Sequence, residues 1–399
     1  MEKIVVKDDE QIELSIVDGD LEAHDGARIT VSSKVDKLVI KGNLVSEGDV
    51  EINGSLEVEE IMHKNGYLEI TGDVLAKRIR IRNGRSGGSK LIVGGNLTAE
   101  ETTVEGGVEV EKDFKCPEVK IMGSCAVYGN ADVETYEVSG SAKHELNLNA
   151  TVVDISGSFK VGGDAIIKEE LEVSGSAKIN GTLDCPEVEI GGSFACNNLI
   201  TNSTDVSGSA KTSTAQVGDK LSVSGSYKCE GSIIAAKLSV SGSSKVGDDS
   251  KIEKLSVSGS STAGDNAKFV DVKVSGSLSL GANTIAENIN VSGSCNSSGL
   301  LRLSEKLQVS GSLKGDEIEA GEISVSGSLT CEIAKADLIT ISRDSRVRGK
   351  LFGGTIIIGD GARVEDITAD VVELGKDVRA GVIAAGTIDA DPSAKYTKG

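Results

Sequence analysis

Three histidines are the residues of this chain best suited to proton transfer near neutral pH. His24 and His63 lie in irregular segments without an obvious nucleophile or carboxylate partner. His144 stands where other repeats of the chain carry an aliphatic residue, so we expect it in the core. Acidic residues scatter over the predicted turns and form no column that could supply a general acid and a general base. We therefore predict no catalytic residue and no enzyme.

Seven cysteines are the other candidates for chemistry. No two of them form a Cys-x-x-Cys pair, so a zinc site is not expected. Their odd number and the lack of a secretory signal argue against a disulfide framework. Five of them fall in columns where other repeats carry Val, Ile, Leu or Phe, and we expect them to face inward as small hydrophobic residues. These five are Cys125, Cys196, Cys229, Cys295 and Cys331. We predict neither a metal nor a cofactor.

A glycine-rich segment at residues 83–90, with Arg85 inside it, could be a phosphate-binding loop. It lacks the Gly-Lys-Ser/Thr ending, and no helix is expected after it, so nucleotide binding is not predicted. Three alternating arginines precede it and put a basic stripe on one strand face. We expect this stripe to pair with a neighbouring acidic coil, and contact with a partner or another subunit is the alternative. The two sets are Arg78, Arg80 and Arg82, and Glu57, Glu59 and Glu60.

The phrase Val-Ser-Gly-Ser returns throughout the stretch from Val119 to Ser328. Its glycines recur every 16 to 18 residues, a period that predicts a solenoid whose repeats contact only their neighbours. Before each glycine, aliphatic and mostly β-branched residues alternate with polar ones, which is typical of strands. The glycines, with two variants of the phrase, are Gly123, Gly140, Gly157, Gly175, Gly192, Gly208, Gly225, Gly242, Gly259, Gly276, Gly293, Gly311 and Gly327.

These patterns predict an all-β fold, a parallel β-helix. Left-handed β-helices repeat every six residues, whereas the glycine here recurs about every 17, so we expect a right-handed, three-sided solenoid with about 17 residues per coil. The composition agrees, because only 3% of the residues are aromatic and a narrow stacked core of small aliphatic side chains does not need them. No asparagine stack is expected.

The repeat divides the chain into five segments. Residues 1–37 should form short strands that either begin the solenoid or cover its end. Residues 38–110 should form divergent coils with an inserted loop, and residues 111–345 the regular coils. Residues 346–390 should continue the solenoid as C-terminal coils, and residues 391–399 should be a disordered tail.

The formal net charge is −20, from 62 acidic and 42 basic residues, which disfavours nucleic acid as a partner. The chain starts without a signal peptide and has no apolar run long enough to span a membrane, so we expect a cytoplasmic protein. One lysine column should face outward, where it would oppose lateral strand pairing, with binding of an acidic partner as the alternative. Its members are Lys143, Lys160, Lys178, Lys211, Lys228, Lys245 and Lys314.

A β-helix ends in an open coil with unpaired backbone groups and an apolar cross-section. Solenoids that stay monomeric cover such ends with polar caps. The C-terminal coils here stay aliphatic and only a short polar stretch follows, so we predict that this end mediates self-association. The candidate residues are Ile356, Ile357, Ile358, Val371, Val372, Leu374, Val382 and Ile383.

Several phrases of the chain resemble those of bactofilins, the polymer-forming cytoskeletal proteins. The closest are Val39-Ile-Lys-Gly-Asn-Leu, Val50-Glu-Ile-Asn-Gly-Ser-Leu and Leu68-Glu-Ile-Thr-Gly-Asp-Val. The resemblance implies a right-handed β-helix that polymerises end to end into nonpolar, nucleotide-independent filaments, and the partner would then be the protein itself. The membrane periphery and cell-envelope proteins are further candidate partners. The alternative function is that of a β-helix carbohydrate-active enzyme or carbohydrate-binding rod.

Overall fold

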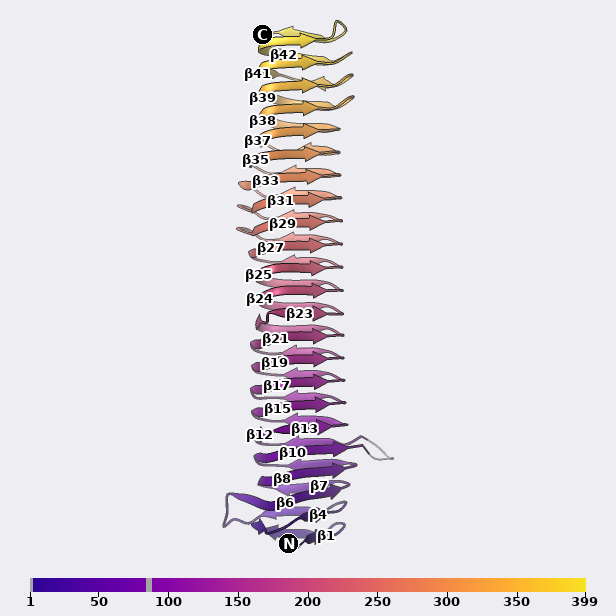
Figure 1. The fold of residues 1–399 in the computed structure, drawn as a ribbon, viewed down its shortest axis with the longest axis vertical. Helices are drawn as coiled ribbons and strands as arrows, with labels where there is room; N and C mark the ends of the chain where they lie inside the picture. The colour runs from indigo at the N-terminus through magenta and orange to yellow at the C-terminus, as the bar shows by residue number, and fades with distance from the viewer. Residues whose placement is uncertain (1–2, 84–87) are drawn as a thin grey trace. The chain divides into compact units, whose positions relative to one another are not determined.

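The computed structural model describes residues 3–83 and 88–399, so Arg85 and the centre of the glycine-rich segment lie outside the described residues. The described chain contains no helix and is 69% strand. It winds as a right-handed parallel β-solenoid of about 23 turns with about 17 residues per coil, which confirms the predicted fold (Figure 1). Two compact units, Met1–Thr201 and Asn202–Gly399, are described separately below.

Most strands of the first unit are short, because each coil is broken by bends. They are β1 (Ile4–Val6), β2 (Gln11–Leu14), β3 (Ile16–Val17), β4 (Leu21–Ala23), β5 (Arg28–Val31), β6 (Lys37–Glu47), β7 (Val50–Asn53), β8 (Ser55–Lys64), β9 (Tyr67–Ile70), β10 (Val74–Arg82), β11 (Lys90–Val93), β12 (Leu97–Thr98), β13 (Glu101–Val104), β14 (Gly107–Val110), β15 (Phe114–Ile121), β16 (Cys125–Val127), β17 (Ala131–Val138), β18 (Ala142–His144), β19 (Leu148–Ile155), β20 (Phe159–Val161), β21 (Ala165–Val173), β22 (Ala177–Asp184) and β23 (Glu187–Ile190).

Strand β24 (Phe194–Val206) contains the boundary residues, and the remaining strands belong to the second unit. They are β25 (Ala210–Val223), β26 (Tyr227–Cys229), β27 (Ile233–Val240), β28 (Ser244–Val246), β29 (Lys251–Val257), β30 (Ser261–Ala263), β31 (Lys268–Val274), β32 (Ser277–Leu280), β33 (Thr284–Val291), β34 (Ser294–Ser297), β35 (Leu300–Val309), β36 (Ser312–Lys314), β37 (Glu317–Val325), β38 (Ser328–Ile341), β39 (Arg346–Ile358), β40 (Arg363–Val364), β41 (Ile367–Leu374), β42 (Arg379–Ala390) and β43 (Lys395–Lys398).

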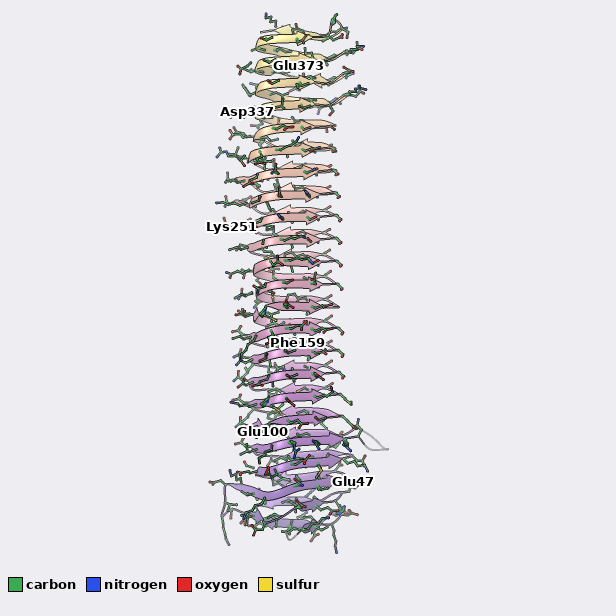
Figure 2. All side chains as sticks on the ribbon, viewed as in Figure 1. Glu47, Glu100, Phe159, Lys251, Asp337 and Glu373 are labelled. Atoms are coloured by element: carbon green, nitrogen blue, oxygen red, sulfur yellow. The ribbon has the colours of Figure 1, made fainter. Side chains whose placement is uncertain are left out.

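The coil made by β20 and β21 shows how the sequence produces three sides. Three pairs of alternating residues point inward and are buried, and a corner of three exposed residues separates the second pair from the third. Figure 2 shows Phe159, a member of the first pair, within its coil. Because side chains alternate along a strand, the residue between each pair faces outward. The pairs are Phe159 and Val161, Ala165 and Ile167, and Leu171 and Val173.

The glycine of each Val-Ser-Gly-Ser phrase marks a bend that stacks directly on the bend of the previous coil. A Cβ atom built on Gly157 would lie 2.2 Å from the carbonyl oxygen of Gly140, closer than real side chains come. The amide of Gly157 also donates a hydrogen bond to that oxygen, at 3.0 Å. The repeat therefore needs glycine because the backbones of successive bends touch.

Neighbouring coils pair in parallel and in register, so equivalent residues of the repeat stack on each other. Leu238 aligns with Leu255, and Val240 with Val257. All four side chains are buried. This stacking of like residues produces the continuous narrow core of each unit.

Residues 3–37, the described part of the N-terminal segment, begin the solenoid and do not cover it. Strands β1, β2 and β3 pair in parallel with β4, β5 and β6 in turn, as the later coils do. The sequence allowed two interpretations of this segment, and the structure favours the one in which it begins the solenoid.

The prediction of a disordered tail at residues 391–399 is wrong. Residues Lys395–Lys398 form strand β43, which pairs in parallel with β42. Asp391 organises the turn between these strands by accepting hydrogen bonds from the amide and the hydroxyl of Ser393. The polar composition suggested disorder, but backbone pairing with an existing strand edge does not require apolar side chains.

The first unit also contains a ladder of turn residues that the sequence analysis expected to be absent. In six successive steps a side-chain oxygen of Asp or Asn accepts the backbone N–H of the equivalent turn residue one coil later, at 2.7 to 3.4 Å. The steady spacing of 17 residues from Asn96 onward was the signal that could have revealed it. The accepting residues are Asp73, Asn96, Asp113, Asn130, Asn147 and Asp164.

Candidate functional site

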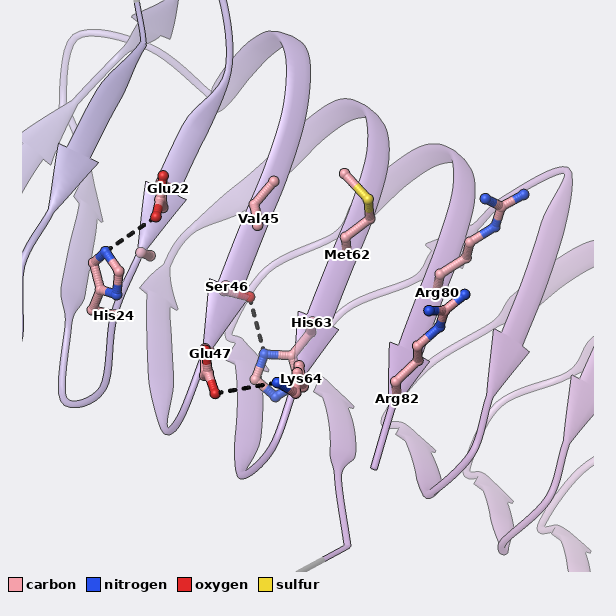
Figure 3. A pocket seen from close by; sticks show the side chains of 11 residues that line it. Glu22, His24, Val45, Ser46, Glu47, Met62, His63, Lys64, Arg80 and Arg82 are labelled. Atoms are coloured by element: carbon pink, nitrogen blue, oxygen red, sulfur yellow. Dashed lines mark hydrogen bonds and ion pairs between the residues drawn. The ribbon is translucent and has the colours of Figure 1, made fainter. Parts of the chain in front are cut away.

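A shallow groove of about 270 Å³ lies on the outer face of the first unit, where β4, β6, β8 and β10 run side by side (Figure 3). The register places Glu22 beside Val45, Val45 beside Met62, and Met62 beside Arg80. Each of the four strands thus contributes one outward residue to the floor of the groove. Its volume is below the range of about 300–1,000 Å³ that is typical of sites for drug-sized ligands.

The groove is acidic at one end and basic at the other. Glu22 contacts His24 at the acidic end, with 3.3 Å between Oε1 and Nε2. Lys64 Nζ lies 3.7 Å from a carboxylate oxygen of Glu47. At the basic end β10 contributes Arg80 and Arg82 (Figure 3). A ligand with separated positive and negative groups would complement this distribution.

The predicted arginine stripe pairs mainly with a single carboxylate. Glu60 lies 3.3 Å from the Arg80 guanidinium and 3.8 Å from that of Arg78. Its side chain is only 11% exposed, so the two guanidinium groups compensate a carboxylate that is largely removed from water. The other two glutamates expected here instead pair with lysines, Glu59 with Lys77 and Glu57 with Lys37.

Ser46 and His63 form a hydrogen-bonded pair just beneath the groove, with 3.0 Å between Oγ and Nδ1. Nε2 of His63 lies 3.3 Å from the carbonyl oxygen of Gly66. If Nε2–H donates to this carbonyl, Nδ1 accepts the hydroxyl proton of Ser46, which is how a base activates a nucleophile. Both residues, however, point into the core and are 3% and 2% exposed. The hydroxyl is therefore not presented to a substrate.

The location of His63 corrects the sequence analysis, which placed it in an irregular segment without a partner. It lies on β8 in the inward column that also holds Ser46. The alternation of Ile61 with His63 was the available signal. Burial lowers the pKa of His63, so the neutral imidazole is favoured inside the coil.

His144 is fully buried, as predicted, with Nε2 3.1 Å from the hydroxyl of Tyr136. Its ring also makes edge contacts with Tyr136 and Phe159. Burial lowers the pKa of His144 to about 4, so it is neutral at pH 7. This histidine packs in the core and does not face a substrate.

The seven cysteines are all buried, which confirms the prediction that those in the inward columns face the core. Burial raises the pKa of the Cys125 and Cys295 thiols to about 12. Because the thiolate is the reactive form, these side chains are inert at neutral pH. Within residues 3–83 and 88–399, no three His, Cys, Asp or Glu side chains are grouped so that they could hold a metal ion. In the same residues, no helix is long and apolar enough to cross a membrane.

The eight candidates for self-association do not share one surface. Four of them face inward and are covered by the next coil: Ile356, for example, aligns with Val372, and Val372 aligns with Ile388. They cannot contact a second copy while β42 stays folded. The inward, covered residues are Ile356, Ile358, Val372 and Leu374, and Ile383 is also fully buried. Ile357 and Val371 are half-buried, and Val382 is 45% exposed on the side of its coil.

The exposed strand edge in the second unit lies beyond most of those residues, in residues 384–390 of β42. This stretch pairs with β41 on one side, while β43 pairs only with Arg379, Val382 and Ile383. Ile388 and Ala390 point inward there but are only half-buried, because no described strand covers them. Of the eight candidates, only Val382 and Ile383 lie on β42, and none lies within residues 384–390.

The first coil of the first unit has a comparable edge. Strands β1, β2 and β3 each pair with one later strand and, among the described residues, with none on the other side. Ile12 and Leu14 of β2 are half-buried for this reason. Both edges thus combine unpaired backbone groups with incompletely covered aliphatic residues.

No protein-family model, curated protein or solved structure matches this chain. The fold and the geometry of the groove and the edges therefore carry the functional argument. The strand edges indicate a function more directly than the groove does, because an unpaired strand edge can pair with a strand of another molecule.

Proposed function

We propose that this protein is a structural, bactofilin-like cytoskeletal or scaffold protein that associates end to end into filaments without a nucleotide. The solenoid fold supports this proposal, because stacked coils supply length and stiffness through a regular backbone ladder. The lateral groove supports catalysis poorly, since its serine–histidine pair is buried and its carboxylates face cations or histidine.

The single observation that carries the proposal is the uncovered edge of β42. Over residues 384–390 the N–H and C=O groups on one side have no strand partner among the described residues. Ile388 and Ala390 present apolar surface beside them. Contact between two such edges would satisfy backbone hydrogen bonds and bury apolar area in one step.

A filament needs a second contact, and the edge of β1, β2 and β3 supplies the surface for it. Pairing of like edges, β42 with β42 and the first coil with the first coil, gives a nonpolar filament with two kinds of isologous contact. This is the arrangement that the bactofilin resemblance implies. A variant with one edge blocked would then stop at a dimer.

Light scattering over a concentration series tests the proposal with the variant Ile388→Lys. We expect the wild-type mass to rise with concentration and the variant to stop at a dimer joined by its first coils. Thr387→Lys is the matched control, because Thr387 lies on the same strand but faces outward. Circular dichroism should show that both variants remain folded. Wild-type protein that is monomeric at every concentration would contradict the proposal.

The groove favours a second candidate function, carbohydrate binding. Its carboxylates and guanidinium groups could form hydrogen bonds with sugar hydroxyls, although none of its eleven lining residues is a Phe, Tyr or Trp that could stack on a sugar ring. Titration with acidic and neutral oligosaccharides, monitored by the melting temperature of wild type and Arg82→Ala, separates the candidates. A saturable rise in melting temperature that Arg82→Ala abolishes would favour the groove.

A further inference from the structure

A ladder of carboxylates runs along one side of the first unit, on the strand segment that precedes each Val-Ser-Gly-Ser bend. The register stacks Glu137, Asp154, Glu172 and Glu189 in four successive coils. Glu170 aligns with Glu187 in the neighbouring outward column. We call these six residues the acidic face. Among the described residues, Glu137 is the one member with an ion-pair partner, Lys120.

This arrangement costs stability, because parallel coils place like charges side by side at the strand spacing of ~4.8 Å. The effect is visible at Glu172, whose pKa is raised chiefly by the charge of Asp154, then by burial and by Glu189 and Glu170. Scattered acidic residues would keep the protein equally soluble without this repulsion. An external cation that binds along the ladder would remove it.

The second unit carries a ladder of the opposite sign on the equivalent segment of its coils. Lys220, Lys237 and Lys254 stack in three successive coils, and Lys273 stands in the adjacent outward column one coil later. We call these four residues the lysine face. Lys220 contacts Asp205 at 3.1 Å, whereas the other three make no ion pair within the described residues. Three serines lie beside the lysines and leave the face open: Ser222, Ser239 and Ser256.

The net charge of residues 207–274, which include the lysine face, has the opposite sign to that of the whole chain. Residues 207–274 contain nine lysines and seven acidic residues, a net charge of +2, whereas the whole chain carries −20. The predicted outward column of Lys211, Lys228 and Lys245 is on another side of the same coils, and two of its three members share Glu230. The lysine face therefore presents three lysines that have no ion pair among the described residues.

We propose that the lysine face binds the acidic face of a second copy of this chain, so that molecules associate side by side. Both faces repeat at the same coil spacing, so successive ammonium groups can meet successive carboxylates without any change in the backbone. Each copy of the chain carries both faces, so the acidic partner is present at the same concentration as the protein itself. This lateral contact uses neither strand edge, so it does not depend on the end-to-end proposal.

Charge reversal tests the pairing in the full-length chain. Lys237→Glu/Lys254→Glu changes the charge of the four-residue lysine face from +4 to 0, and Glu172→Lys/Glu189→Lys changes that of the six-residue acidic face from −6 to −2. We expect each variant alone to self-associate at least tenfold more weakly than wild type in sedimentation at low salt. Mixing the two variants should restore association, because the unchanged acidic face of one variant then meets the unchanged lysine face of the other. High salt should weaken the wild-type contact.

The control is Lys251→Glu/Lys268→Glu, which makes the same charge change in the same region but on a different side. Figure 2 shows Lys251 projecting outward from its coil. We expect this variant to associate as wild type does. Loss of association that mixing does not restore, or equal loss in the control, would overturn the proposal. Wild-type protein that binds polyphosphate at low salt but does not self-associate would also overturn the proposal. Loss of end-to-end filament growth in Ile388→Lys is a separate result, because that variant tests the edge of β42 and not the lysine face.

Discussion

One inward position of the coil carries phenylalanine in two coils of the first unit and serine in two successive coils of the second. In the first unit this column alternates Ala142, Phe159, Ala177 and Phe194, so that Phe159 lies between two small neighbours. In the second unit Ser244 and Ser261 stack directly on each other after Tyr227, and neither hydroxyl finds a hydrogen-bond partner in the described residues. The coil geometry thus tolerates very different core volumes, because it is set by the backbone ladder and the glycine bends.

The largest expected effect tests what the two units share. Val240→Asp places a carboxylate in the dry inward column with no partner, and we expect a loss of about 4 kcal/mol or more. Val240 is 3% exposed. The neighbouring Ser239→Asp faces outward and should cost little. Chemical denaturation that shows equal losses for both variants would contradict the alternation.

A slightly smaller loss should reveal how the units differ. Phe159→Ala removes a ring that is 1% exposed and leaves a cavity between Ala142 and Ala177, at an expected cost of about 3–5 kcal/mol. The restored-volume variant Phe159→Leu should lose much less. If thermal unfolding showed both variants equal to wild type, the rings would not be filling the core of the first unit.

Mild acid should distinguish the units next, because all three histidines lie in the first. Burial lowers the pKa of His144 in the folded protein to about 4 from its ordinary value of 6.5, so the unfolded state binds more protons between these two pH values. The stability that neutral His144 supports is therefore fully present above pH 6.5 and decreases as the pH falls toward 4. The expected decrease in the free energy of unfolding is on the order of 3 kcal/mol. Hydrogen exchange should show protection falling in the first unit, and His144→Leu should reduce that fall.

The smallest effect has the opposite sign. Ser261→Ala removes a buried hydroxyl that has no partner in the described residues, and we expect a gain of about 1 kcal/mol. Ser260→Ala, at the exposed neighbouring position, is the control and should change nothing. A loss of melting temperature for Ser261→Ala would show that the hydroxyl has a partner that stabilises the fold.

The fold could be predicted from the sequence because each coil repeats the same local rules. Val240 and Val257 show the inward column directly, and the glycine bends fix the period. The ends and turns were harder, because backbone pairing there depends on which edge the chain meets and not on hydrophobicity. The β43 strand and the Asp73 ladder are examples. The buried Ser46–His63 pair was missed because two polar residues replaced the aliphatic signal in that column.

Electron microscopy of purified wild-type protein, with no nucleotide added, tests the central claim of self-association most directly. The account predicts filaments whose length grows with protein concentration, and loss of that growth in Ile388→Lys while side-by-side contacts persist at low salt. Single particles of uniform length at every concentration and salt would contradict it.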